Sequence, residues 1–273
     1  MWPFAHSDGE YCLSVRSMTA VFVLAGMVGI IDFRDDSSAV AAESPSGKQQ
    51  VRAQTLECIQ DALGGVQALS RIASLRILGE TKPASTSGLR SLPGSREIRL
   101  VFPDRYQRID IGRPPGAAGA TLNSVIGFDR TQLLSSPRVR DAAEAMRAAR
   151  WDFEIQTWMR LPRLAKGTRV ARRAMPGSPS RQFALEISTM DGFRASLQAD
   201  TLSCTPTALE YRTTIYPQST TTRVTLAAYR AFGDIRFPTV LTTWAGAEPS
   251  SIETVSTVEL NAPNSKRYFV PER

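Results

Sequence analysis

Apolar and polar residues alternate through a series of short segments from residue 74 onward. Ile98, Leu100 and Phe102, for example, fall at every second position. Successive side chains of a β-strand point to opposite faces of a sheet, so this period of two predicts strands. Turn-forming residues such as Gly233-Asp234 separate neighbouring segments and indicate hairpins. The pattern predicts about 10–11 strands, with segments at residues 74–80, 98–102, 106–111, 121–128, 183–187, 193–197, 208–214, 223–229, 237–244 and 252–260.

Two regions follow a helical period instead. Residues 51–72 carry two apolar stripes interrupted by Gly64-Gly65, which predicts two short helices at an angle. Within residues 137–166 the apolar residues recur at helical spacing, and Pro162 should end or kink this longer helix. Its apolar stripe either packs against the sheet or lines and plugs an apolar cavity.

These elements predict a mainly β (α+β) fold. A meander of hairpins gives one large, strongly curved antiparallel sheet, an open half-barrel, and such a sheet must cover its apolar face. The N-terminal helices and the long mid-chain helix are the available covers. If they fill the concavity incompletely, an apolar pocket is left.

The N-terminal region reads as an export signal. Residues 17–31 form an apolar run of 15 residues that is short for a membrane span and suits a signal-peptide core. We expect a signal peptide and cleavage region at 1–42, a flexible tether at 43–50 and a half-barrel domain at 51–273. The predicted location is the periplasm; the alternative is an inner-membrane anchor with the domain facing the periplasm.

The charge of the chain is strongly basic. Removing residues 1–42 takes two basic and five acidic residues from the 33 and 26 of the whole chain and leaves a net charge of +10. The arginines are scattered rather than gathered in a block, and an exported protein rarely meets nucleic acid, so we expect no nucleic-acid partner. Two interpretations stay open: a solvated surface, or contact with the anionic headgroups of a membrane.

Few residues are available for catalytic chemistry. His6 is the single histidine and lies in the expected signal region, which excludes histidine-based nucleophilic sites and zinc sites from the exported chain. Cys58 and Cys204 could form a disulfide or stay buried thiols. A hydrolase would need two converging carboxylates; the candidates Asp104, Asp110, Asp191 and Asp200 fall at turns or on strand faces. We therefore predict a protein that is not an enzyme and holds no metal or cofactor.

Several segments resemble one protein family in their order along the chain: ALGGVQALSRIASLRILGE at 62–80, VFPDRYQRIDIG at 101–112, DTLSCTPTALEY at 200–211, YRAFGDIRFPTVL at 229–241 and VELNAPNSKRYFVP at 258–271. Together they resemble the LolA/LolB superfamily of periplasmic lipoprotein carriers and related outer-membrane lipoprotein-sorting-like proteins. The resemblance implies an open half-barrel closed by helices, with an apolar interior that shelters lipid-modified chains.

The predicted function is binding of lipid or acyl chains in that interior, with a role as a lipoprotein or lipid carrier. Expected partners are a lipid or an acylated protein, an anionic membrane surface, and an inner- or outer-membrane protein. One alternative is an envelope sensor or protein-interaction domain of the same fold, and another is a carboxylate-based hydrolase. The candidate cavity-lining residues, each of which could equally be ordinary core, are Leu75, Ile77, Ile98, Leu100, Phe102, Trp151, Trp158, Phe183, Leu185, Leu209, Tyr211, Val240 and Trp244.

Overall fold

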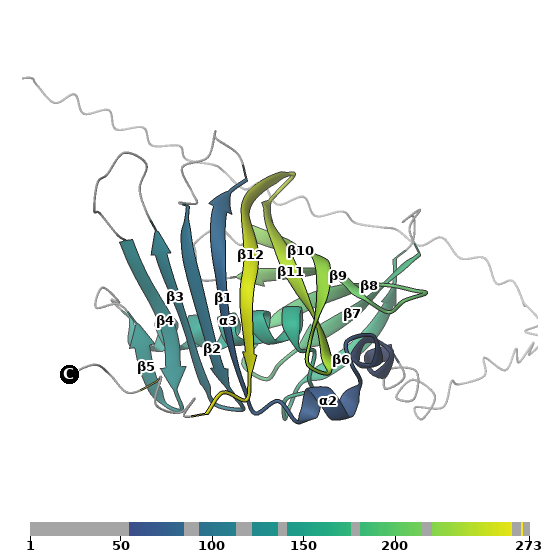
Figure 1. Cartoon of the computed structure of the whole chain (residues 1–273), viewed down its shortest axis with the longest axis horizontal. Helices are drawn as coiled ribbons and strands as arrows, with labels where there is room; N and C mark the ends of the chain where they lie inside the picture. The colour runs from purple at the N-terminus through teal and green to yellow at the C-terminus, as the bar shows by residue number, and fades with distance from the viewer. Residues whose placement is uncertain are drawn as a thin grey trace, which may run out of the picture. The chain divides into compact units, whose positions relative to one another are not determined.

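A computed structural model describes residues 55–84, 93–112, 122–135, 141–175, 181–213, 220–263 and 269 (Figure 1). All of them belong to one compact unit of the chain, Glu43–Arg273. The predicted signal peptide at 1–42 and the tether at 43–50 lie outside the described residues. No helix in the described ranges is long and apolar enough to cross a membrane.

The fold is mostly β, as predicted: one open antiparallel sheet of twelve strands in the order β5-β4-β3-β2-β1-β12-β11-β10-β9-β8-β7-β6. Neighbouring strands are joined mainly by hairpins, and the first strand, β1, pairs with the last, β12. The strands are β1 (Ser74–Pro83), β2 (Gly94–Val101), β3 (Arg105–Gly112), β4 (Leu122–Asp129), β5 (Gln132–Ser135), β6 (Arg169–Ala174), β7 (Gln182–Ser188), β8 (Arg194–Asp200), β9 (Pro206–Thr213), β10 (Thr220–Phe232), β11 (Ile235–Ala245) and β12 (Glu248–Leu260).

The two strands that the alternation did not single out, β5 and β6, are the edges of the sheet. β5 has four residues and β6 reads RVARRA, so neither shows an apolar position at every second residue. An edge strand has one unpaired side and is commonly short or charged, which protects it from pairing with other chains. The edges therefore lack the pattern that marks the inner strands.

Helix α3 (Ala142–Arg160) connects these two edges in the sequence and crosses one face of the sheet (Figure 1). It packs against β3, β4 and β5 on one side and against β9 on the other. At its start the Asp141 carboxylate accepts hydrogen bonds from the Ala143 and Glu144 amides at 2.9 and 3.2 Å. It ends before Pro162, as the sequence predicted. We use the term inner face for the side of the sheet that α3 covers.

The N-terminal helices also form as predicted, with a break at the two glycines. Helical residues 55–62 precede α2 (Val66–Ser70), and Gly64 and Gly65 have φ of 121° and 93°. A side chain at Gly64 would place its Cβ 2.2 Å from the Asp234 carbonyl oxygen, so only glycine fits against this turn. The first of the two helices is fixed further by a disulfide between Cys58 and Cys204, one of the two alternatives that the sequence left open.

Candidate functional site

The inner face carries one continuous apolar cluster that includes most of the predicted lining residues. Leu75 pairs with Leu100 and Ile77 with Ile98 across β1 and β2. On the other half of the sheet, Leu185 and Leu209 both flank Leu197. The buried members of the predicted set, which share this cluster, are Leu75, Ile77, Ile98, Leu100, Phe183, Leu185 and Leu209 from the sheet and Trp151 and Trp158 from α3. These residues pack against one another and α3; that a ligand enters between them stays a prediction.

Two further predicted residues are half-buried at the margin of the same face. Phe102 has its ring centroid 5.8 Å from that of Phe153 on α3. Tyr211 pairs with the buried Ala195 and follows Leu209 on the same side of β9. Both residues combine contact with the cluster and partial exposure, which makes them suitable places to probe entry of a ligand.

The remaining two predicted residues lie on the opposite face of the sheet. Val240 pairs with Ala227 and with Thr254, which are both exposed. Its neighbour Leu241 is 2% exposed and points inward with Leu226. Trp244 pairs with the exposed Arg223 and also points outward. Because both faces of β11 carry large apolar residues, the sequence alternation assigned Val240 and Trp244 to the wrong face.

Polar side chains run along α3 between its apolar residues. Asp152, Gln156 and Arg160 are spaced four residues apart and therefore lie on one side of the helix. Arg160 is 0% exposed, and its guanidinium donates to the side chains of Gln156 and Glu253. The Asp152 carboxylate accepts from Arg108 Nη1 at 2.6 and 2.7 Å. The helix is thus attached to β12 and β3 by charge-assisted hydrogen bonds.

The same contacts extend across the inner face as a connected chain of charges, which we call the inner network. Arg96 links Glu253, with Nη1 2.7 Å from Oε2, to Asp110, with Nε 2.5 Å from Oδ1. Asp110 in turn accepts from Arg108 Nε at 3.0 Å. Tyr106 donates its hydroxyl to the Asp152 carboxylate at 2.5 Å. The members of the inner network are Tyr106, Arg108, Asp110, Arg96, Glu253, Asp152, Gln156 and Arg160.

Burial and neighbouring charges shift the pKa values of several groups in and beside the inner network. Burial alone would raise the pKa of the Glu253 carboxyl, but Arg160 and Arg96 outweigh it and lower that pKa. Burial disfavours the charge of Arg108, yet Asp152, Tyr106 and Asp110 together outweigh burial and raise the pKa of the guanidinium. Burial, reinforced by Asp152, raises the pKa of Tyr211 to about 12. Such fixed charges hold elements together and are poorly suited to exchange protons with a substrate.

One enclosed carboxylate has a different environment. Glu154 lies on α3, and its carboxylate accepts a hydrogen bond from Trp158 Nε1 at 3.2 Å. Burial raises the pKa of Glu154 to about 7, and the charge of Asp191 adds to this shift. No arginine or lysine forms an ion pair with Glu154 among the residues that the structure describes. The surroundings of Glu154 thus bring the pKa of its carboxyl close to neutral pH.

The four carboxylates considered for a hydrolase are held apart by separate partners. Asp110 belongs to the inner network, and Asp104 lies 3.7 Å from Arg130 Nε. Asp200 accepts from the backbone amides of its own turn, and Asp191 accepts from Thr189 within the β7–β8 turn. Within the described part of the chain no group of three His, Cys, Asp or Glu residues could hold a metal ion.

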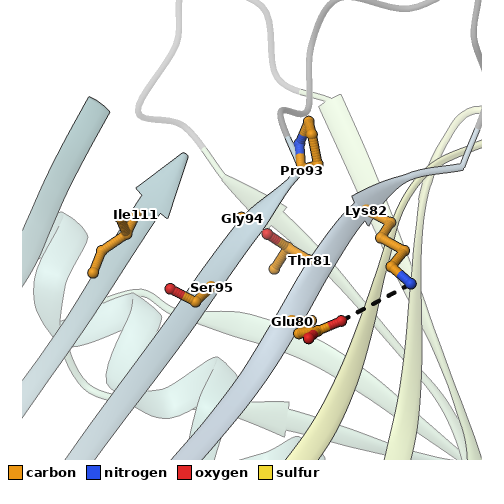
Figure 2. A pocket seen from close by; sticks show the side chains of 7 residues that line it. All are labelled: Glu80, Thr81, Lys82, Pro93, Gly94, Ser95 and Ile111. Carbon is orange, nitrogen blue, oxygen red and sulfur yellow. Dashed lines mark ion pairs between the residues drawn. The ribbon is translucent and has the colours of Figure 1, made fainter. Parts of the chain in front are cut away.

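Among the residues that the structure describes, two hollows lie outside the apolar cluster. The larger, about 530 Å³, is at the ends of β1, β2 and β3 (Figure 2). Its lining includes Glu80 and Lys82, whose charged atoms lie 3.9 Å apart; the full set is Glu80, Thr81, Lys82, Pro93, Gly94, Ser95 and Ile111. A second hollow of about 390 Å³ adjoins the disulfide. Both are lined by residues other than those predicted for a cavity.

The sequence reasoning missed the inner network although a signal for it exists. Tyr106, Arg108 and Asp110 alternate on β3 in phase with the buried Leu100 and Ile98 of β2, with which Tyr106 and Arg108 pair. The alternation places Arg108 and Asp110 on one face of a strand but gives no reason to expect that face inward. On the helix, the four-residue spacing of Asp152, Gln156 and Arg160 was obscured by the apolar residues between them.

The chain was compared with known families, curated proteins and solved structures. No protein-family model matches it, and no curated protein matches its sequence. A LolA superfamily protein from Nitrosomonas europaea aligns with a TM-score of 0.47 and 10% identity over 80% of this chain and 98% of that one. A putative outer membrane lipoprotein-sorting protein domain from Vibrio parahaemolyticus gives 0.43 and 12% over 77% and 93%. A DUF1329 family protein from Desulfovibrio piger gives 0.48 and 10% over 80% and 97%.

Proposed function

We propose that this protein is a non-catalytic periplasmic binding protein that holds the acyl chain of a lipid or an acylated protein between the inner face of its sheet and α3. The observation that carries the proposal is the apolar cluster shared by the two halves of the sheet. A surface of this kind, covered by one helix, offers an acyl chain a water-free site once the helix moves aside.

The attachment of α3 supports the proposal. Its contacts with β3 and β12 include hydrogen bonds and ion pairs from Asp152 and Arg160. Polar contacts have defined partners, so the helix can return to one position after a ligand leaves. The apolar residues of α3, including Trp151 and Trp158, would then contact either the sheet or a bound chain.

Two other observations fit a role outside the cytoplasm and without catalysis. The disulfide between Cys58 and Cys204 suits an oxidising compartment such as the periplasm. The inner network holds its charges firmly, and the four candidate carboxylates are kept apart by separate partners. This arrangement favours a protein that binds over one that hydrolyses.

The test is titration of the full chain with fatty acids that carry a fluorescent group. Burial of a methylene contributes about 0.8 kcal/mol, so two more methylenes should tighten binding about ten-fold until the site is full. Native mass spectrometry of the protein purified from cells should show a bound lipid at one copy per chain. Affinity that does not depend on chain length, or an absence of probe binding, would refute the proposal.

A pair of variants locates the site. Tyr211→Trp enlarges a half-buried residue of the inner face, and Val240→Trp makes a larger increase in side-chain volume on the outer face. We expect Tyr211→Trp to weaken probe binding several-fold and Val240→Trp to leave it unchanged. Thermal melting of both variants verifies that they are folded. Equal effects of the two substitutions would show that binding does not take place on the inner face.

A further inference from the structure

Two exposed apolar side chains lie on two segments that touch at one end of the strands next to the β6 edge. Leu164, in the segment between α3 and β6, is 54% exposed, and Met190, in the β7–β8 turn, is 84% exposed. The two segments touch: a Cβ on Gly167 would lie 2.7 Å from Met190 Cε. Large apolar side chains at this exposure contact water in the isolated protein, and here they project from neighbouring turns.

Basic side chains lie on the outer face of the strands that adjoin these two segments. Ser188 pairs with Arg169 on β6 and with Arg194 on β8, so the two arginines flank it. Both point away from the core, because the next residue on each strand, Val170 or Ala195, pairs with the buried Ile187. Arg212 follows Tyr211, the partner of Ala195, and so continues the row. Together with Lys166 in the preceding turn, these residues form a basic row beside Leu164 and Met190.

The positive charge of this row is not balanced by ion pairs. Across the described ranges, Lys166, Arg169, Arg194 and Arg212 take part in no ion pair, and all four are exposed. The nearest acidic groups have other roles. Asp191 accepts from Thr189 in its own turn, and Glu186 lies 3.7 Å from Arg173. Glu154, with its pKa near 7, is only partly ionised at neutral pH.

We propose that this surface docks on an anionic lipid membrane. We call this patch of the protein the docking surface; its members are Leu164, Lys166, Arg169, Met190, Arg194 and Arg212. Apolar tips that insert between headgroups, ringed by lysine and arginine that contact them, are the combination that interfacial binding requires. A protein partner would need a broader contact than two side chains on adjacent turns, since stable interfaces bury about 800 Å² on each side. The proposal is independent of acyl-chain binding on the inner face.

The test measures binding of the full chain to phosphatidylcholine vesicles with and without one third phosphatidylglycerol. Each basic residue near an anionic surface contributes about 1 kcal/mol, so Arg169→Gln/Arg194→Gln should weaken binding to the anionic vesicles about thirty-fold. Arg147→Gln/Arg230→Gln removes the same charge from exposed positions elsewhere and should change binding little. The apolar N-terminal run is present in every variant, so its contribution cancels in the comparison.

A second pair of variants tests the apolar tips. Leu164→Ser/Met190→Ser should weaken binding to the anionic vesicles about ten-fold, because two apolar side chains no longer enter the bilayer. Leu202→Ser, which changes a residue 72% exposed on the β8–β9 turn, should have no effect. Equal loss from the paired arginine variants, or binding that ignores phosphatidylglycerol, would overturn the proposal. Fatty-acid binding measured on the same variants should be unchanged, which separates this result from the test of the proposed function.

Discussion

The two faces of β1, β2 and β12 each carry a network of arginine and acidic side chains. The two networks differ in how far their most buried carboxylates are exposed to solvent. On the outer face Arg76 donates to Glu97 and Glu259, and Arg99 donates to Glu97. On the inner face, the inner network joins Arg96 to Glu253 and Arg160. The side chain of Glu259 is 39% exposed, whereas that of Glu253 is 8% exposed.

The difference shows how position in a strand changes the effect of an ion pair. Water and salt screen charges on the outer face, so each pair there contributes little to the free energy of unfolding. On the inner face the side chains of Arg160 and Glu253 are 0% and 8% exposed, so these two charges have lost most of their water and each depends on its partner.

The largest effect on stability is expected when the inner network loses its central carboxylate, Glu253. Glu253→Gln leaves Arg160, which is fully buried, without an opposite charge. Removal of one partner of a buried pair costs about 3–5 kcal/mol in the free energy of unfolding. Glu259→Gln, the matched change on the outer face, should cost about 0–1 kcal/mol. Urea denaturation of both variants measures the two values, and similar losses would contradict the contrast between the faces.

An intermediate effect concerns a carboxylate enclosed without an arginine. Glu154 has a folded pKa of about 7, above its value in the unfolded chain. Between the two pKa values the folded state binds more protons, so stability falls as pH rises from about 4.5 to 7 and then levels off. Glu154→Gln removes this dependence. Its Tm relative to the original protein should therefore rise by several degrees from pH 5 to pH 8.

One outcome of the melting experiment would contradict a raised pKa for Glu154. A difference in Tm that stays constant between pH 5 and pH 8 would show that Glu154 ionises in the folded protein as it does in the unfolded chain. Trp158→Phe offers an independent check, because it removes the indole N–H that donates to the Glu154 carboxylate. Since that hydrogen bond favours the charged form, its loss should raise the pKa of Glu154 further.

The smallest effect is expected on the outer face itself. Glu97 lies 2.7 Å from Arg76 and 2.8 Å from Arg99. Glu97→Gln should cost about 1 kcal/mol in low salt and less at high ionic strength. Burial would raise the pKa of Glu97, but Arg99 and Arg76 outweigh it and lower that pKa. The contribution is therefore present above the unfolded pKa and disappears as pH falls through the folded pKa, which denaturation at a series of pH values would detect.

Sequence periodicity predicted the antiparallel sheet, the break at Gly64-Gly65 and the end of the long helix before Pro162. These features depend on local patterns that one strand or helix shows by itself. The inner network could not be predicted in the same way, because its pairs join residues far apart in sequence, such as Arg160 and Glu253. Val240 failed for a related reason: both faces of β11 are apolar, so only strand pairing distinguishes inward from outward.

The pairing of β1 with β12 also has a consequence for the order of folding. Leu75 on β1 pairs with Leu260 on β12. One edge of β1 therefore stays unpaired until β12, which is synthesised much later, has formed. Contacts so distant along a chain form slowly, and an uncovered strand edge invites association with other chains. An incomplete chain would leave this edge open, and a chaperone that shields unpaired strands would be most needed at this stage.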